Sequence, residues 1–505
     1  MIYINKRREV FFDDYLIDTE NTTAELRLHR PVRRKEPIMV FDKPWEGDRV
    51  GYLSIIKDGD LYRMYYIANS SGSGRPYHFC YAESGDGLNW VKPSLGICEF
   101  MGSRENNIII YPGMIEGLDA FDNMKVFIDE CPNCPPDEKY KAVMAWCGHK
   151  TLIYLASSDA IHWRYGGIIT DQGEFDSHNL AFYSSELKKY LCYYRGEHEP
   201  KANQPDKEKS FAPKLSRMLY DKERGMYRAP AEDTEGDYFM RDVRVVESAD
   251  FKNWTDPVLI NFGKNADDIQ LYTNAVMPYP RAEQVLIGFP TRYIERKGWT
   301  KNYDELCARE IRRERIRADE PREGLALTDC AFMVSRDGYN FKRYDEAFII
   351  PTPEHPLAWG YGDCYPAPYL LETESDIPGA ESEYSILICE NHNMRVPEVL
   401  YRHTIRKDGF VSRHAGGEEK VLMTKPFIFG GDRMYANVES SARGYLYFTL
   451  IDEGGKRYES VEVFGNSIDR RIHFPADTLS RLEGKCVRME IRMLDADIYS
   501  IRFGN

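Results

Sequence analysis

A short turn motif recurs along the chain and constrains the fold more than any other feature of the sequence. It has the form Ser-x-Asp-x-x-x-(Trp/Phe), and its four copies begin at Ser84, Ser157, Ser248 and Ser335. A worn fifth copy reads Lys407-Asp-Gly-Phe. In each copy a strand-like run ends in an Asp turn, and an aromatic residue begins the next run. Similar units at a long period indicate a repeat architecture.

Two further strand-like runs precede each copy of the motif. In the first unit they are residues 52–56 and 61–66, joined by an Asp-Gly-Asp turn. Five units of about four antiparallel strands, with few helical patterns between them, predict an all-β fold, a five-bladed β-propeller. A string of unrelated β-sandwiches is the alternative, but it would not repeat one turn at one place in every unit.

The repeat stops near residue 413, and alternating apolar runs such as residues 487–493 follow. We therefore expect the propeller over residues 1–413 and a C-terminal β-sandwich over residues 414–505. Polar insertions near residues 201–237 and 295–323 interrupt the third and fourth units.

Composition narrows the partners and the compartment. Aromatic residues make up 13% of the chain, which suits both β-blades and sugar clefts. The formal net charge of −14 argues against nucleic acid and anionic membrane as partners. No apolar run is long enough to span a bilayer, and no signal peptide pattern is visible. Eleven scattered cysteines are typical of free thiols in a reducing cytoplasm, so a cytoplasmic location is expected.

No motif in the sequence predicts a cofactor or a metal site. Cys131 and Cys134 have the spacing of metal ligands, but no second pair follows them. Nucleotide-binding glycine loops, nucleophile elbows and zinc-protease motifs are also absent from the sequence.

A five-bladed propeller followed by a β-sandwich resembles glycoside hydrolases of families 32, 43, 62 and 68. The segment Leu53–Tyr66 is similar to the opening strand pair of family 43 enzymes. The chain departs from these families in lacking the Asn-Asp-Pro-Asn and Arg-Asp-Pro signatures, and Tyr52 stands where an Asp is expected. The resemblance implies a divergent glycosidase, and no named activity within those families carries over.

Propeller geometry places a site without any motif. The innermost strand of each blade starts at one end of the central channel, so the residues before it line a shared pocket. A glycosidase needs one protonated and one ionised carboxyl group there. For any single Asp, capping a turn is the commoner role, so the prediction depends on several such segments converging. The catalytic candidates are Asp176, which we favour, then Asp122 and Asp48, with Asp242 and Glu390 as alternative acids.

The same segments and the loops that rise beside them supply candidates for substrate binding. Paired Arg and carboxylate groups can hold adjacent sugar hydroxyls, although a salt bridge between blades is an equally good interpretation for each Arg alone. The candidates are Trp45, Glu46, His178, Asn179, Arg195, Arg241, Tyr272, Asn274, Arg292, Asp363 and His392.

Both insertions fall between the second and third strands of their blades and should overhang the pocket. Residues 309–317 are predicted to form a charged helix. Loops this long usually act as lids or as contacts in a homo-oligomer, and a solvated charged face is the alternative. We expect a narrow, exo-acting pocket.

The leading hypothesis is a glycoside hydrolase that removes a terminal sugar from small glycosides or oligosaccharides. A glycoside phosphorylase on the same fold remains open, with phosphate held by Arg195, Arg241, Arg244 and Arg292. A non-catalytic carbohydrate-binding propeller is the third possibility, but pure binding gains little from several close carboxylates.

Overall fold

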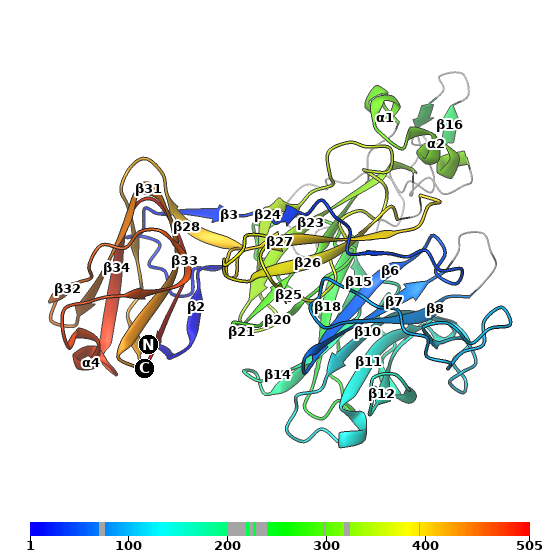
Figure 1. The fold of residues 1–505 in the computed structure, drawn as a ribbon, viewed down its shortest axis with the longest axis horizontal. Coiled ribbons are helices and arrows are strands. Elements are labelled where there is room, and N and C mark those ends of the chain that lie inside the picture. The colour runs from blue at the N-terminus through cyan, green and yellow to red at the C-terminus, as the bar shows by residue number, and fades with distance from the viewer. Residues whose placement is uncertain are drawn as a thin grey trace.

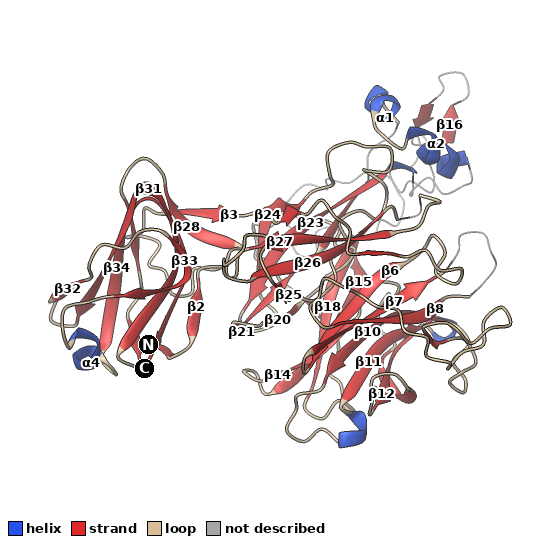
Figure 2. Cartoon of the chain, viewed as in Figure 1, coloured by secondary structure: helices blue, strands red, loops and turns tan. Residues whose placement is uncertain are grey.

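The structure is a computed structural model of the chain, and strands dominate it (Figure 2). It describes residues 1–69, 76–199, 219–221, 226–228, 240–295, 299–317, 324–392 and 394–505. None of the helices in these ranges is long and apolar enough to cross a membrane.

Five separate sheets form the five blades, so the predicted all-β propeller is confirmed (Figure 1). In the first two blades each strand pairs antiparallel with its sequence neighbour and so forms a meander, and the Gly59-Asp60 turn joins β6 to β7. The first blade consists of β6 (Gly51–Asp58), β7 (Leu61–Ala68), β8 (His78–Ser84) and β9 (Ile108–Ile110). The second consists of β10 (Phe121–Ile128), β11 (Tyr140–Trp146), β12 (Thr151–Ser157) and β13 (Arg164–Thr170).

The third and fourth blades carry the insertions. The third consists of β14 (Leu180–Ser184), β15 (Lys189–His198), β18 (Met240–Ser248) and β19 (Val258–Leu259). The fourth consists of β20 (Met277–Tyr279), β21 (Ala282–Gly288), β22 (Thr291–Glu295), β23 (Ala326–Ser335) and β24 (Phe341–Ile349). Helices α1 (Lys301–Glu305) and α2 (Arg309–Arg317) lie between β22 and β23, so the predicted charged helix is confirmed. Most of residues 201–237 lie outside the described residues, apart from the hairpin of β16 (Leu219–Asp221) and β17 (Met226–Arg228).

The fifth blade is completed by the start of the chain. Its own strands are β25 (Leu371–Thr373), β26 (Glu383–Glu390) and β27 (Val399–Ile405). The N-terminal strands β4 (Val32–Arg33) and β5 (Met39–Val40) pair with β27 and close the ring. The start of the chain thus supplies the outer strands of the last blade before it enters the first blade at β6.

The repeated turn is held by a local hydrogen-bond network. In the first copy the Ser84 hydroxyl donates to Asp86 over 3.0 Å and accepts from the backbone N–H of Gly87. The Asp86 carboxylate accepts the N–H groups of Leu88 and Asn89, both over 2.8 Å. The copies at Ser157 and Ser335 repeat this pattern, and the copy at Ser248 repeats its Asp contacts. The aromatic residues of these copies pack into or against the blade cores. The motif therefore determines the blade turn and contributes nothing to the channel.

A second domain follows the propeller, and its ten strands form one sheet around a single core. Seven strands come from the C-terminal part, namely β28 (Val411–Ala415), β29 (Lys420–Met423), β30 (Phe427–Phe429), β31 (Arg433–Asp452), β32 (Arg457–Glu459), β33 (Asn466–Ile472) and β34 (Cys486–Gly504), with the short helix α4 (Thr478–Leu482). The other three are N-terminal, namely β1 (Ile2–Asn5), β2 (Arg8–Val10) and β3 (Glu25–Leu28).

The N-terminal strands correct the predicted domain boundaries. Strand β1 pairs with β30, β2 with β34 and β3 with β28, so residues 2–28 belong to the second domain rather than to the propeller. Figure 1 accordingly shows both chain ends in that domain. Strand β28 also begins before residue 414. The sequence did not predict that residues 2–28 belong to the second domain, because the first copy of the repeat motif begins only at Ser84.

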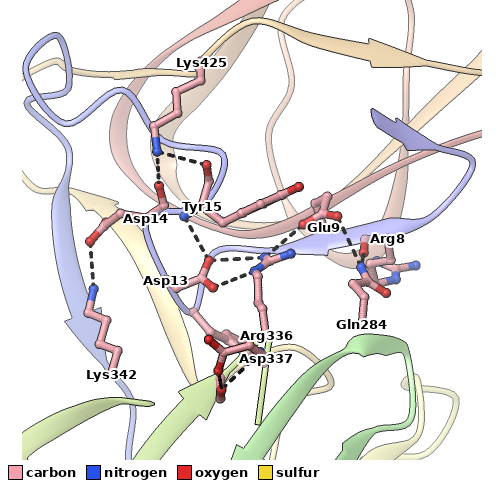
Figure 3. A network of polar contacts seen from close by, with 12 residues as sticks. Arg8, Glu9, Asp13, Asp14, Tyr15, Gln284, Arg336, Asp337, Lys342 and Lys425 are labelled. Carbon is pink, nitrogen blue, oxygen red and sulfur yellow. Dashed lines mark hydrogen bonds and ion pairs between the residues drawn. The ribbon is translucent and has the colours of Figure 1, made fainter. Parts of the chain in front are cut away.

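A polar network joins the two domains (Figure 3). Arg336 of the fourth blade contacts Glu9 over 3.0 Å and Asp13 over 2.7 Å, and Lys342 contacts Asp14 over 3.1 Å. Burial raises the pKa of the Glu9 carboxyl, while the Arg336 charge opposes that rise. The N-terminal segment thus ties both domains together.

Candidate active site

The segments that lead into the inner strands adopt unusual backbone conformations. Tyr52, Asn123, Ala275 and Cys364 all have positive φ angles, between 44° and 62°. Residues other than glycine rarely adopt this region, and such strain gathers at functional sites. Four of the five blades therefore enter the channel through a strained residue.

Tyrosine rings form the centre of the channel mouth. Tyr272 stacks on Tyr365 with 5.5 Å between ring centroids, and Tyr52 lies 6.0 Å from Tyr365. The Tyr361 hydroxyl donates to the Tyr272 hydroxyl over 2.8 Å. Tyr272 was a candidate from the sequence. Tyr52 and Tyr365 were not, although Tyr52 stands where the resemblance expected a carboxylate.

Asp122 lies beside this cluster, at the start of β10. Burial raises its pKa to about 6, and the nearby N–H of Asn123 and the charges of Lys125 and Arg195 oppose the rise. Burial also lowers the pKa of the Lys125 ammonium to about 7. Lys125 donates to the backbone carbonyl of Tyr52, which links the first two blades. Asp122 can therefore exchange a proton near neutral pH.

Glu398, immediately before β27, is the carboxyl group that sequence reasoning missed. Its Oε1 accepts the N–H of Val50 over 2.8 Å and lies 3.0 Å from Nδ1 of His392. Its Oε2 is buried with no hydrogen-bond partner among the described residues, and a Cβ at Gly51 would lie 3.9 Å from it. Burial raises the pKa of Glu398, His392 opposes the rise, and Asp48 adds to it. The sequence signal that could have identified Glu398 is its position as a charged residue directly before the apolar strand β27.

Asp363 is a third carboxyl group with a shifted pKa. Burial raises its pKa to about 7, and the charge of Glu390 adds to the rise. The N–H of Gly360 donates to Asp363 over 3.0 Å, and Arg312 and His392 oppose the shift. The substrate-binding candidate Asp363 thus titrates near neutral pH beside His392.

Asp176, the favoured catalytic candidate, forms an ion pair with Arg195. Its side chain is 57% exposed, whereas that of Arg195 is only 6% exposed. The carboxylate of Asp176 is thus open to solvent and held by a guanidinium, unlike the buried carboxyl groups nearby.

His178 and Asn179 follow Asp176 into the channel, and both are buried. Both ring nitrogens of His178 and the Oδ1 of Asn179 lack a hydrogen-bond partner within the described part of the chain. The His178 ring lies 5.3 Å from that of Tyr52, and burial holds its pKa well below the usual range. His178 is therefore a neutral group facing the tyrosine cluster.

Several other candidates make contacts that hold the blades. Trp45 donates to Asn107 over 2.7 Å, and the buried Glu46 contacts Lys92 over 2.7 Å. Asn274 donates to the backbone carbonyl of His178 over 2.9 Å. The two alternative acids are also paired, Asp242 with His198 over 3.0 Å and Glu390 with Arg33 over 2.5 Å. The substrate-binding candidate Arg292 is paired with Asp329 over 2.6 Å.

Helix α2 reaches toward this end of the propeller. A small cavity is lined by Arg312 and Arg315 of α2 together with Tyr361 and His392. Glu314 of α2 also forms an ion pair of 2.9 Å with Arg395 in the loop before β27. The fourth-blade insertion therefore covers the fifth-blade side of the channel mouth.

No family model matches the chain, and no curated protein matches it. Similar solved structures include a glycosyl hydrolase from Bacteroides ovatus (TM-score 0.42, 12% identity, covering 80% of this chain and 99% of that one). Another comes from work on the GH130 family of mannoside phosphorylases, which contains glycoside hydrolases that target β-1,2 mannosidic linkages in Candida mannan. Its TM-score is 0.41 at 11% identity, and the match covers 78% of this chain and 96% of that one. A third is the catalytic domain of the Coprinopsis cinerea GH62 α-L-arabinofuranosidase, with a TM-score of 0.40 at 8% identity. That match covers 75% of this chain and 97% of the other.

With TM-scores of 0.40–0.42, these similarities add nothing to the five-bladed β-propeller that the sheets of the chain themselves define. Identities of 8–12% say nothing about substrate or mechanism.

Proposed function

We propose that the protein is a glycoside hydrolase that releases a terminal sugar from small glycosides or oligosaccharides. One observation carries the proposal: three carboxyl groups with raised pKa values, those of Asp122, Asp363 and Glu398, surround one tyrosine-lined channel mouth. Glycoside hydrolysis needs an acid that is still protonated and a second carboxylate that is ionised at the same pH.

The surroundings of the carboxyl groups suggest different roles. Glu398 is buried against Val50 and has one oxygen without a partner among the described residues, which suits a general acid. Asp122 lies near the cationic Lys125 and Arg195, which favour its ionised form, so it suits a base or nucleophile. Asp363 would bind a sugar hydroxyl.

The test is sugar release from a panel of aryl glycosides and oligosaccharides. We expect Asp122→Asn and Glu398→Gln each to lower kcat by about 10³-fold or more with little change in KM, since these groups would act in the transition state. Asp137→Asn, at an exposed position of the second blade, and Glu381→Gln, at an exposed position of the fifth, are the matched controls.

The leaving group separates the two roles. If Glu398 is the general acid, Glu398→Gln keeps most of its activity on dinitrophenyl glycosides, whose leaving group needs no proton, while Asp122→Asn does not. Near-native turnover by both variants on the natural type of substrate would contradict the proposal. Activity that requires added phosphate would favour the phosphorylase alternative, and sugar binding without turnover would favour the binding protein.

A further inference from the structure

Two guanidinium groups lie near one tyrosine ring in the channel mouth. The Cζ atom of Arg195 lies 5.2 Å from the ring centroid of Tyr272, and that of Arg241 lies 5.6 Å from it. Arg195 projects from β15 and Arg241 from the neighbouring β18, and their strands pair directly. Both side chains therefore come from the third blade.

Both groups have buried nitrogens that no described residue satisfies. These are Nε and Nη1 of Arg195 and Nε of Arg241. A buried donor without a partner costs about 1–3 kcal/mol, and more when it is charged, so native proteins rarely leave one without a reason. Three such nitrogens around one ring indicate a ligand that accepts hydrogen bonds.

The charge of the cluster limits what that ligand can be. The charge of Arg195 is balanced by Asp176, its ion-pair partner. Arg241 donates over 2.6 Å to Gln270, which is neutral. Among the described residues, about one positive charge of this arginine pair thus has no counter-ion. It matches one carboxylate better than a phosphate dianion.

We propose that the terminal sugar taken by this site is acidic, with its carboxylate held by Arg195 and Arg241 beside Tyr272. This inference rests on the proposed hydrolase and adds a substrate class, the uronides. Guanidinium groups bind carboxylates through parallel N–H···O contacts. The carboxylate would point to the third blade, which leaves the glycosidic bond for Asp122 and Glu398.

Binding by the Asp122→Asn variant tests this inference without relying on turnover. Calorimetry would compare galacturonate with galactose, glucuronate with glucose, and inorganic phosphate alone. We expect at least one uronate to bind about tenfold or more tightly than its neutral parent. Arg241→Gln should remove that preference, and Arg241→Lys should restore part of it because the charge remains without the planar group.

Arg164→Gln, on the exposed outer strand of the second blade, is the matched control and should leave the preference intact. Equal binding of acidic and neutral sugars would overturn the inference. Binding of phosphate alone would also overturn it and would assign the arginines to phosphorolysis. A uronate preference without hydrolysis of any uronide would contradict the proposed hydrolase and leave the carboxylate site standing.

Discussion

Tyr52 shows how one residue changes the layout of this site. The families that the chain resembles place a carboxylate at this position, and here a tyrosine adopts a φ of 45° and packs against His178. The raised-pKa carboxyl groups lie instead on the second blade, at Asp122, and on the fifth, at Asp363 and Glu398. At the scale of the residue, burial is what raises the pKa of these groups and suits them to proton transfer.

The raised pKa of Asp122 has a consequence for stability. The carboxyl titrates near 3.8 when unfolded and at about 6 when folded, so the folded state holds the proton more tightly. Its stabilising contribution is complete below pH 4 and is lost as the pH rises through 6. We expect Asp122→Asn, which cannot ionise, to gain about 1–2 kcal/mol of unfolding free energy relative to the native protein between pH 4.5 and pH 8.

Urea unfolding at the two pH values measures this difference. The matched control is Asp137→Asn, whose carboxyl is exposed on the same blade, and it should show no such dependence on pH. A pH-independent difference for Asp122→Asn would contradict the raised pKa.

At the scale of the element, the blade turn is built from contacts that span only a few residues. In the fourth blade Ser335 donates to Asp337 over 3.1 Å and accepts the N–H of Gly338 over 3.0 Å. The Ser side chain is buried, whereas the Asp side chain lies at the surface. Removal of the hydroxyl would therefore leave a buried backbone donor without a partner.

We expect Ser335→Ala and Ser157→Ala each to lower the free energy of unfolding by about 1–2 kcal/mol. The two turns belong to different blades, the second and the fourth, so the double variant should lose the sum of the two. Urea denaturation measures all three variants, and Ser185→Ala at an exposed turn is the control. A double variant no less stable than either single one would contradict independent turns.

The ring closure is the second feature at this scale. Arg33 of β4 binds Glu390 at the end of β26 through two contacts of 2.5 and 2.8 Å, and the guanidinium lies 3.7 Å from the ring centroid of Tyr401. Glu390 was an alternative acid from sequence. Its contacts instead join the N-terminal strand to the fifth blade.

At the scale of the whole molecule, Asp408 joins the propeller to the second domain. This residue belongs to the worn fifth copy of the motif and is fully buried. It accepts from Tyr279 over 2.6 Å in the propeller and from Ser500 over 2.7 Å in the second domain. Arg8 and Arg281 each lie 3.1 Å from it. The fifth copy has thus exchanged a turn cap for an interdomain contact.

Removal of the Asp408 charge should destabilise the entire chain. We expect Asp408→Ala to cost about 3–5 kcal/mol of unfolding free energy, because Arg281 would lose its ion-pair partner and the buried Arg8 would keep only Asp469, 3.1 Å away. Burial raises the pKa of Asp408, but the two arginine charges lower it further, so the net shift is downward. The stabilisation is therefore present above about pH 4 and is lost as the pH falls below that value.

Thermal unfolding at pH 7 measures the loss, and limited proteolysis shows whether the two domains separate. Asp432→Asn, at an exposed turn of the second domain, is the control. An unchanged Tm for Asp408→Ala would contradict the role of this contact.

The sequence by itself determined the blades, because the turns that define them are made by hydrogen bonds between residues two or three apart. The charged helix at 309–317 was likewise readable from its own composition. Knowledge that five inner strands meet at one channel was enough to bring Asp122, His178, Tyr272 and Asp363 to notice.

Only the tertiary structure decided which polar groups are free to act. Glu398 owes its burial and its hydrogen bond to Val50, 348 residues away, and the division of the N-terminal strands between two domains depends on pairings just as distant. Glu390 is held in an ion pair by Arg33, whereas burial raises the pKa of Asp122. Partners from distant parts of the chain decide which of these two states a carboxyl group adopts. Local sequence carries no record of these long-range contacts, and they determine the solvation and pKa of the site.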